Sequence, residues 1–134
     1  MREEANGWIR KNFGQGQMRT HKDLEIWKRG IELVEKIYKL SSTFPKEESY
    51  GIISQMRRSV VSYPTNIAEG AARFSRKEFI QFVYISLGTL SELETLTIIS
   101  LRLGYHSNRD VLGEIEVLRK MTLNFIKYLK SIKK

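Results

Sequence analysis

The sequence predicts an all-α protein that folds as an antiparallel up-down-up-down four-helix bundle. Apolar residues recur at alternating intervals of three and four through four long segments, which is the period of an amphipathic helix. Only two prolines occur among the 134 residues, so the chain is poor in turn signals. Short connections join the segments, and such connections between long helices make successive helices antiparallel neighbours.

Residues 1–20 contain three glycines and no sustained period, which predicts a flexible N-terminal tail, and residues 21–134 form the predicted bundle domain. The first helix is expected at 22–43, because Pro45 pushes the residue before it out of the α region. This helix has two apolar stripes about 120° apart, and one stripe is enough to close a monomeric bundle. The other needs a wider core or a neighbouring subunit. The stripes are Leu24, Trp27, Ile31, Val34 and Tyr38, and Ile26, Gly30, Leu33, Ile37 and Leu40.

The remaining helices follow from their caps and periods. The second is expected at 47–71, with Pro64 inside it. The third opens on a capping box formed by Ser75 and Glu78 and reaches about residue 103, where Gly104 is the natural residue to stop it. The fourth helix is capped by Ser107 or Asn108 and carries an apolar seam with coiled-coil spacing.

Composition argues against several classes of protein. The chain has no cysteine, which excludes disulfides, thiolate metal sites and a cysteine nucleophile. Its two histidines, His21 and His106, do not follow a glutamate at the spacing of a di-iron bundle, and neither lies on a helix face to activate a serine. We therefore expect no catalytic residue, no metal and no cofactor. With no run of 18 uncharged apolar residues and no signal peptide, we expect a cytoplasmic protein without a membrane span.

The chain is basic, with a formal net charge of +8, and residues 105–134 carry +4 of it. A basic surface attracts polyanions because binding releases their counterions. Lysines near a helix C-terminus also suit the helix dipole, so the cations of the last helix have two explanations. Elsewhere, the candidate phosphate contacts are Arg57, Arg58, Arg73, Arg76 and Lys77.

These candidates fall into two groups. Arg57 and Arg58 point away from the apolar face of the second helix. The segment 73–77 combines three cations, an aromatic ring and a helix N-terminus within five residues, which suits phosphate contacts with base stacking. Surface ion pairs with Glu69 or Glu78 are the alternative explanation for these cations.

A polar stripe runs along the second helix, beside its apolar stripe. It suggests a hydrogen-bond ladder, between helices or between subunits, that fixes register. The other interpretation is a groove that faces a ligand or RNA. Glu94 falls within the apolar stripe of the third helix and needs a partner there, such as Asn66 or an arginine of the second helix. A Glu69–Glu94 acid/base pair is a third, enzymatic, interpretation. The predicted structural polar network comprises Gln55, Ser59, Ser62, Asn66, Glu69 and Glu94.

Several motifs resemble one known family. Leucine and tryptophan open the first helix, and Phe-Pro-x-x-Glu and Tyr-Gly follow at 44–51. Residues 55–70, QMRRSVVSYPTNIAEG, contain Gln-x-Arg-Arg and Asn-Ile-Ala-Glu-Gly. These motifs resemble the four-helix-bundle proteins encoded in intervening sequences of bacterial 23S rRNA genes, over about residues 21–130. Tyr63 stands where that pattern often has isoleucine.

This resemblance implies a homopentameric assembly of four-helix bundles. It also implies kinship to accessory proteins of diversity-generating retroelements, which bind a reverse transcriptase and nucleic acid through a basic surface. No enzyme activity is established for the family. We therefore expect a non-enzymatic homo-oligomer that binds nucleic acid, RNA rather than DNA. The alternative is a protein-interaction adaptor that docks a reverse transcriptase.

Overall fold

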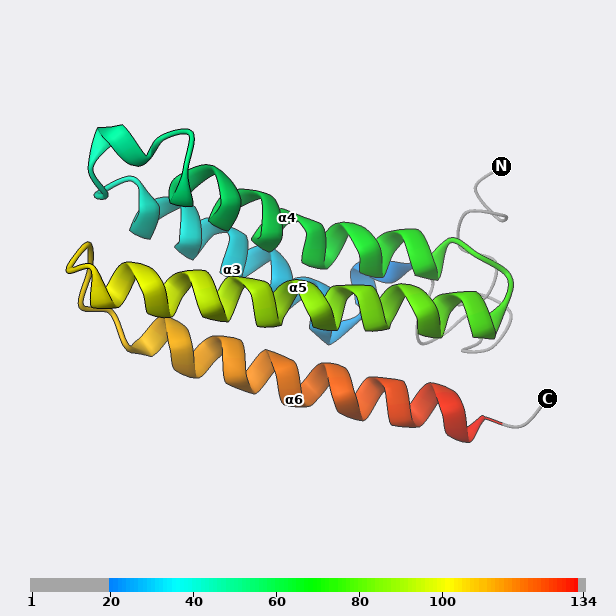
Figure 1. Cartoon of the computed structure of the whole chain (residues 1–134). Coiled ribbons are helices and arrows are strands. Elements are labelled where there is room, and N and C mark those ends of the chain that lie inside the picture. The colour runs from blue at the N-terminus through cyan, green and yellow to red at the C-terminus, as the bar shows by residue number, and fades with distance from the viewer. Residues whose placement is uncertain (1–19, 133–134) are drawn as a thin grey trace.

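The computed structural model of the chain describes residues 20–132 and has four long helices in that range, each antiparallel to the next (Figure 1). This confirms the predicted all-α four-helix bundle. The predicted tail lies outside the described residues, apart from its last residue. The helices are α3 (Glu25–Ser41), α4 (Ile52–Ala71), α5 (Arg76–Arg102) and α6 (Asp110–Ser131), with 3-10 turns η1 (His21–Asp23) and η2 (Lys46–Glu48).

The second helix begins five residues later than the sequence predicted. Residues 46–48 form the separate turn η2, and the Gly51 N–H bonds back to the Glu48 carbonyl (3.0 Å) before α4 starts at Ile52. Proline at 45 favours this tight turn, because its fixed φ suits the first residue of a turn but its ring blocks a preceding helix.

The ends of the other helices follow the predicted caps more closely. Ser75 Oγ accepts the Glu78 N–H (3.2 Å), but the Glu78 carboxylate turns to Arg73, so only half of the predicted capping box forms. Gly104 has φ +81°, and its N–H and that of Tyr105 bond to carbonyls of the last turn of α5, which is a Schellman C-cap. Asn108 Oδ1 accepts the Val111 N–H (3.2 Å) at the start of α6.

The core contains most of one apolar stripe of the first helix and part of the other. Ile26, Gly30, Leu33 and Ile37 are buried against the other helices. The Tyr63 ring and Pro64 of α4 lie where a side chain on Gly30 would stand, 2.7 Å and 3.5 Å from an ideal Cβ. This missing side chain lets α3 approach α4 closely. Of the second stripe, Leu24 is buried and Trp27 and Val34 are partly buried against the core, whereas Ile31 and Tyr38 are exposed.

A hydrogen bond crosses the core between α4 and α6. The Tyr63 hydroxyl lies 2.7 Å from Thr122 Oγ1, and the single hydroxyl proton of Thr122 goes to the Leu118 carbonyl (2.7 Å). Tyr63 is therefore the donor. Burial raises the pKa of the Tyr63 phenol well above its usual value, so the proton it donates stays in place. Ser86 Oγ adds a bond from α5 to the Tyr63 carbonyl (2.8 Å).

The α3–α4 and α5–α6 connections meet at one end of the bundle, opposite the α4–α5 turn (Figure 1). The Phe44 ring stacks on His106, with centroids 5.8 Å apart and planes at 7°, and also contacts Tyr105. The Tyr105 hydroxyl donates to Glu48 Oε2 (2.8 Å). Side chains of the two connections are thus joined to each other.

The outer face of α5 is unusually apolar. Between Phe79 and Leu101, Glu92 is the one charged residue among those that are exposed. Only 33% of the most apolar 18-residue stretch of α5 is buried within the bundle. By length and composition alone this helix is able to cross a membrane. In the bundle its inner face packs against α4 and α6.

Candidate nucleic-acid interface

Arg57 is engaged with the end of α3. Its Nε donates to Ser41 Oγ (2.9 Å) and its Nη2 to the Tyr38 carbonyl (3.2 Å), and the guanidinium lies 4.5 Å from the centroid of the Tyr38 ring. The Tyr38 carbonyl also accepts the Ser42 N–H (3.1 Å), so Arg57 adds a second donor to this carbonyl and links α4 to the end of α3. This residue has a structural task within one chain.

Replacing Arg57 by glutamine is expected to destabilise the protein by about 1 kcal/mol, because the hydrogen bonds to the end of α3 are lost. Thermal or urea unfolding followed by circular dichroism measures this. Arg109→Gln is the matched control, since Arg109 is exposed and makes no side-chain cap. If Arg57→Gln is as stable as the parent chain, the bonds of Arg57 to α3 do not stabilise the fold.

Arg58 differs from its neighbour. It is exposed and lines a hollow of about 550 Å³ beside α3, together with Tyr38 and Val61. Thirteen residues of α4 separate it from Ala71, which is about 20 Å at 1.5 Å per residue. Arg57 and Arg58 therefore lie far from the other three predicted cations.

Those three cations lie around the α4–α5 turn. Arg73 pairs with Glu69 (3.0 Å) and Glu78 (3.5 Å), and its guanidinium lies 5.0 Å from the centroid of the Phe82 ring. These ion pairs are exposed, and pairs of this kind contribute about 0–1 kcal/mol each. They therefore leave the Arg73 guanidinium available to a stronger anionic partner.

Arg76 and Lys77 open α5 at the same turn. Arg76 Nη1 donates to the Leu129 carbonyl in the last turn of α6 (3.2 Å). This bond proves that the C-terminal end of α6 lies beside the start of α5. Lys77 is exposed. The five predicted cations thus form two separate groups, and only the second group gains further cations from α6.

The cations that α6 adds are Lys127 and Lys130, both exposed. Lys130 Nζ donates to the Tyr84 hydroxyl (2.7 Å) and lies 5.1 Å from the centroid of that ring. We call this surface the basic end. It combines five cations with two carboxylates, Glu69 and Glu78, for a net charge of +3. Its members are Arg73, Arg76, Lys77, Lys127 and Lys130, with the exposed aromatic residues Phe74, Tyr84 and Tyr128.

The sequence did not single out Tyr84 and Tyr128. Their rings are 43% and 45% exposed, and an exposed ring beside lysines provides a stacking surface for a base. A signal was present, because Tyr84 lies well away from the buried stripe of Phe79 and Val83 on the helical wheel. Antiparallel packing of α5 and α6 then brings Tyr84 together with the lysines of the last helix.

The predicted polar stripe does not form a network within one chain. Ser59 Oγ donates to the carbonyl of its own helix at Met56 (3.0 Å), and Asn66 Nδ2 donates to that of Ser62 (2.9 Å). Among residues 20–132, no hydrogen bond joins two side chains of the six predicted members, Gln55, Ser59, Ser62, Asn66, Glu69 and Glu94. The predicted hydrogen-bond ladder between helices is therefore not found within one chain. A hydrogen-bond ladder between subunits stays a prediction.

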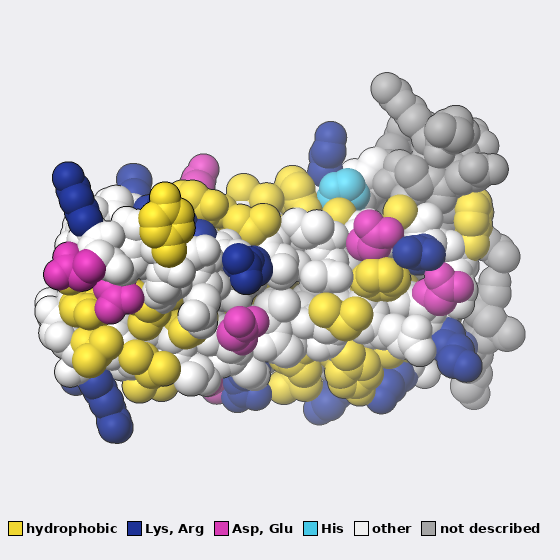
Figure 2. Space-filling view, turned by 45° about the horizontal axis from the view of Figure 1, so that its top comes forward, with side chains coloured by type: hydrophobic (Ala, Val, Ile, Leu, Met, Phe, Trp, Pro, Cys, Tyr) yellow, Lys and Arg dark blue, Asp and Glu magenta, His cyan; other side chains and the backbone are white. Residues whose placement is uncertain are grey.

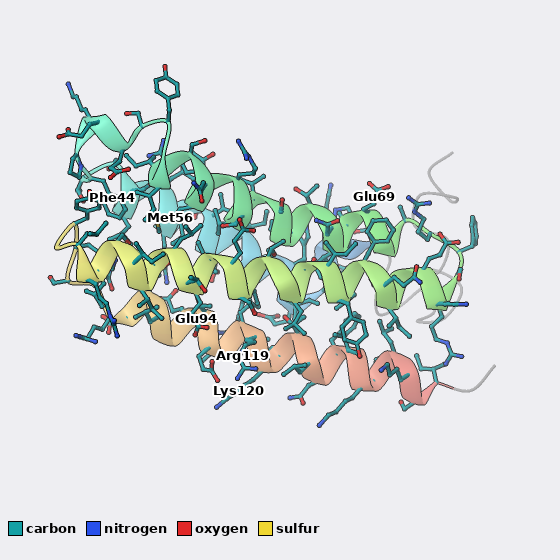
Figure 3. All side chains as sticks on the ribbon, viewed as in Figure 1. Phe44, Met56, Glu69, Glu94, Arg119 and Lys120 are labelled. Atoms are coloured by element: carbon teal, nitrogen blue, oxygen red, sulfur yellow. The ribbon has the colours of Figure 1, made fainter. Side chains whose placement is uncertain are left out.

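Glu94 lies on the side of α5 that faces α6 and is half-buried (Figure 3). It does not pair with Asn66 or with an arginine of α4, as the sequence suggested. The hydrogen bond from Arg119 to Glu116 (2.6 Å) chiefly raises the pKa of the Arg119 guanidinium, and the charge of Glu94 adds to this. Glu94 therefore interacts electrostatically with Arg119 of α6.

The geometry does not bring Glu69 and Glu94 together. Glu69 lies at the end of α4 and pairs with Arg73, whereas Glu94 lies in the other half of the bundle, level with Met56 (Figure 3). The thirteen residues between Met56 and Glu69 correspond to about 20 Å. Within residues 20–132, no cluster of three or more His, Asp or Glu side chains is placed to hold a metal ion.

Comparison with known protein families identifies a matching family model. A family model described as "23S rRNA-intervening sequence protein" matches residues 22–124, which is more than three quarters of the chain. The matched range begins in η1, contains α3, α4 and α5, and ends within α6. No curated protein matches the chain.

Proposed function

The chain belongs to the family of 23S rRNA-intervening sequence proteins, and from this premise we propose that it is a non-enzymatic, homo-oligomeric, cytoplasmic protein that binds RNA through its basic end. The observation that carries the proposal is the meeting of five cations and three exposed aromatic rings from α5, α6 and the α4–α5 turn. Arg57 and Arg58 are left out, because one is engaged with α3 and the other lines an apolar hollow.

The chemistry of the basic end suits phosphates and unpaired bases together. Arg73, Arg76 and the lysines provide phosphate contacts, which give affinity without sequence specificity. Tyr84 and Tyr128 offer faces for stacking, and unstacked bases occur in the loops and bulges of folded RNA. This combination favours RNA over duplex DNA as the ligand.

The test is a salt series with a labelled RNA stem-loop, followed by fluorescence anisotropy. If five cations contact phosphates, log K should fall with log salt with a slope of about −3.5, so that affinity drops roughly 100-fold between 50 and 200 mM salt. A DNA hairpin of the same sequence is expected to bind more weakly. Affinity that does not change with salt, or no binding at 50 mM, would contradict the proposal.

The second candidate is a protein-interaction adaptor, for instance one that docks a reverse transcriptase. The observation in its favour is the apolar surface left exposed on α3, α4 and α5. The same salt series separates the two functions, because an adaptor without an RNA site binds the stem-loop weakly at every salt concentration.

A further inference from the structure

An apolar groove runs between α3 and α4 on the outside of the bundle. Two hollows of about 490 and 550 Å³ share Val61 and Thr65 in their walls, so the groove is continuous along both helices. Figure 2 shows hydrophobic side chains following one another along the upper edge of the molecule. We call this surface the α3–α4 groove; its walls include Trp27, Ile31, Val34 and Tyr38 from α3 and Val61 and Thr65 from α4.

A convex apolar surface lies on α5, away from this groove. Its residues follow 3–4–3–4 spacing and form one stripe on the outside of the helix. Gly88 lies in this stripe, and no atom lies within 4 Å of its ideal Cβ position. A neighbouring helix can therefore approach the backbone of α5 closely at this residue. At 1.5 Å per residue the stripe is about 21 Å long, and the groove from Trp27 to Tyr38 is about 17 Å. We call this surface the α5 ridge: Ile85, Gly88, Glu92, Thr95 and Ile99.

Contacts inside the bundle fix the heights of these residues along its axis. Ser86 Oγ bonds to the Tyr63 carbonyl, and Gly70 lies against Phe79. In both pairs the residue numbers add to 149. Because α4 and α5 are antiparallel, residues whose numbers add to about 150 lie level with each other. Glu92 on the ridge is therefore level with Arg58, at the edge of the groove.

This equality of height decides which charges meet in a closed ring. Rotation about an axis parallel to the bundle moves a copy sideways without shifting it along the axis. Level residues then face each other across the interface. Glu92, the one charge on the ridge, then meets Arg58. These opposite charges favour this register, and like charges would oppose it.

We propose that the α5 ridge of one copy docks into the α3–α4 groove of the next, with Glu92 opposite Arg58, so that the chains close head to tail into a ring. The partner is a second copy of this chain, since this chain supplies a concave and a convex surface of similar length, and Arg58 and Glu92 have opposite charges at the same height. The proposal rests on the self-association within the proposed function and specifies its surfaces. The number of copies in the ring is not part of it.

The experiment measures molar mass by light scattering of the full chain at micromolar concentration, with folding checked by circular dichroism. Val61→Glu places a carboxylate in the groove, and Ile99→Glu places one on the ridge. Each change is expected to weaken self-association by about 100-fold or more and to give 15.7 kDa monomers. Val117→Glu is the matched control, because Val117 is an exposed valine of α6 outside both surfaces, and it should leave the mass unchanged.

Mixing the two variants gives the sharper result. The Val61→Glu chain keeps an intact ridge and the Ile99→Glu chain keeps an intact groove, so an equal mixture should form a dimer with twice the monomer mass and nothing larger. In addition, Arg58→Glu and Glu92→Arg should each weaken the ring, and the double variant should restore it.

The outcomes are distinguishable from failure of the proposed function. An oligomer whose mass neither variant changes overturns the assigned surfaces and leaves self-association intact. Occupation of the groove by residues 1–19 of the same chain predicts this same unchanged mass, and it too overturns the proposal. A parent chain that is monomeric overturns both the ring and the homo-oligomer, whereas RNA binding by the basic end is measured separately in the salt series.

Discussion

Replacing Gly70 with valine is expected to destabilise the bundle by about 3 kcal/mol, near the upper end of the usual cost of overpacking a core. An ideal Cβ on Gly70 would lie 2.7 Å from Phe82 Cβ and 2.9 Å from Phe79 Cδ1. It would also lie 3.3 Å from the Phe79 carbonyl oxygen, which belongs to the backbone and cannot rotate away. Any side chain therefore pushes α4 and α5 apart where they pack closely. Differential scanning calorimetry should show a melting temperature lower by about 10 °C.

Gly113→Val is the matched control. Gly113 lies within α6 with nothing within 4 Å of its ideal Cβ, so valine there meets open space. The two variants have the same composition and replace a helical glycine by the same residue. We expect the control to stay within about 0.5 kcal/mol of the parent chain. If both variants lose the same stability, the close α4–α5 contact at Gly70 is not the cause of the loss.

Reversing three lysines of the basic end is expected to lower RNA affinity by about 100-fold. The variant is Lys77→Glu/Lys127→Glu/Lys130→Glu, and all three side chains are exposed, so the fold should be retained. Three lost phosphate contacts should also flatten the dependence of log K on log salt by about 2, at roughly 0.7 per contact on a single strand. Anisotropy with the same RNA stem-loop measures both quantities.

The matched control reverses three exposed cations away from the basic end, Lys39→Glu/Lys46→Glu/Arg109→Glu. It changes the net charge from +8 by the same amount, so both variants have the same mean attraction to a polyanion. We expect the control to keep its affinity within about fivefold of the parent and nearly the same slope. Equal losses in the two variants would show that net charge alone, and not the arrangement at the basic end, holds the RNA.

The fold was predictable because the apolar period and the caps act locally. Ser75, Gly104 and Asn108 mark helix ends through hydrogen bonds that span only a few residues. The choice between the two stripes of the first helix was not predictable, since both have the same spacing and similar apolar content. That choice depends on Gly30 meeting Tyr63 and Pro64, which lie more than thirty residues away in the sequence.

The candidate site was predictable only in part, for a related reason. The segment around Arg73 and Lys77 was visible because its cations are close in sequence. Lys130 joins them because α6 runs back along α5, a long-range contact that spacing does not reveal. In the same way, Arg57 looks like a free surface cation in the sequence, yet its donors are used by carbonyl and hydroxyl oxygens at the end of α3.

The stacked Phe44 and His106 rings and the Tyr105–Glu48 hydrogen bond join the two loops at one end of the bundle. Separating the helices at that end therefore breaks contacts between the loops as well as contacts within the core. Local opening is easiest where few contacts must break. The loop contacts thus raise the free energy of local unfolding at this end above what the core there provides alone, and amide hydrogen exchange of the last turn of α3 should be slowed by them.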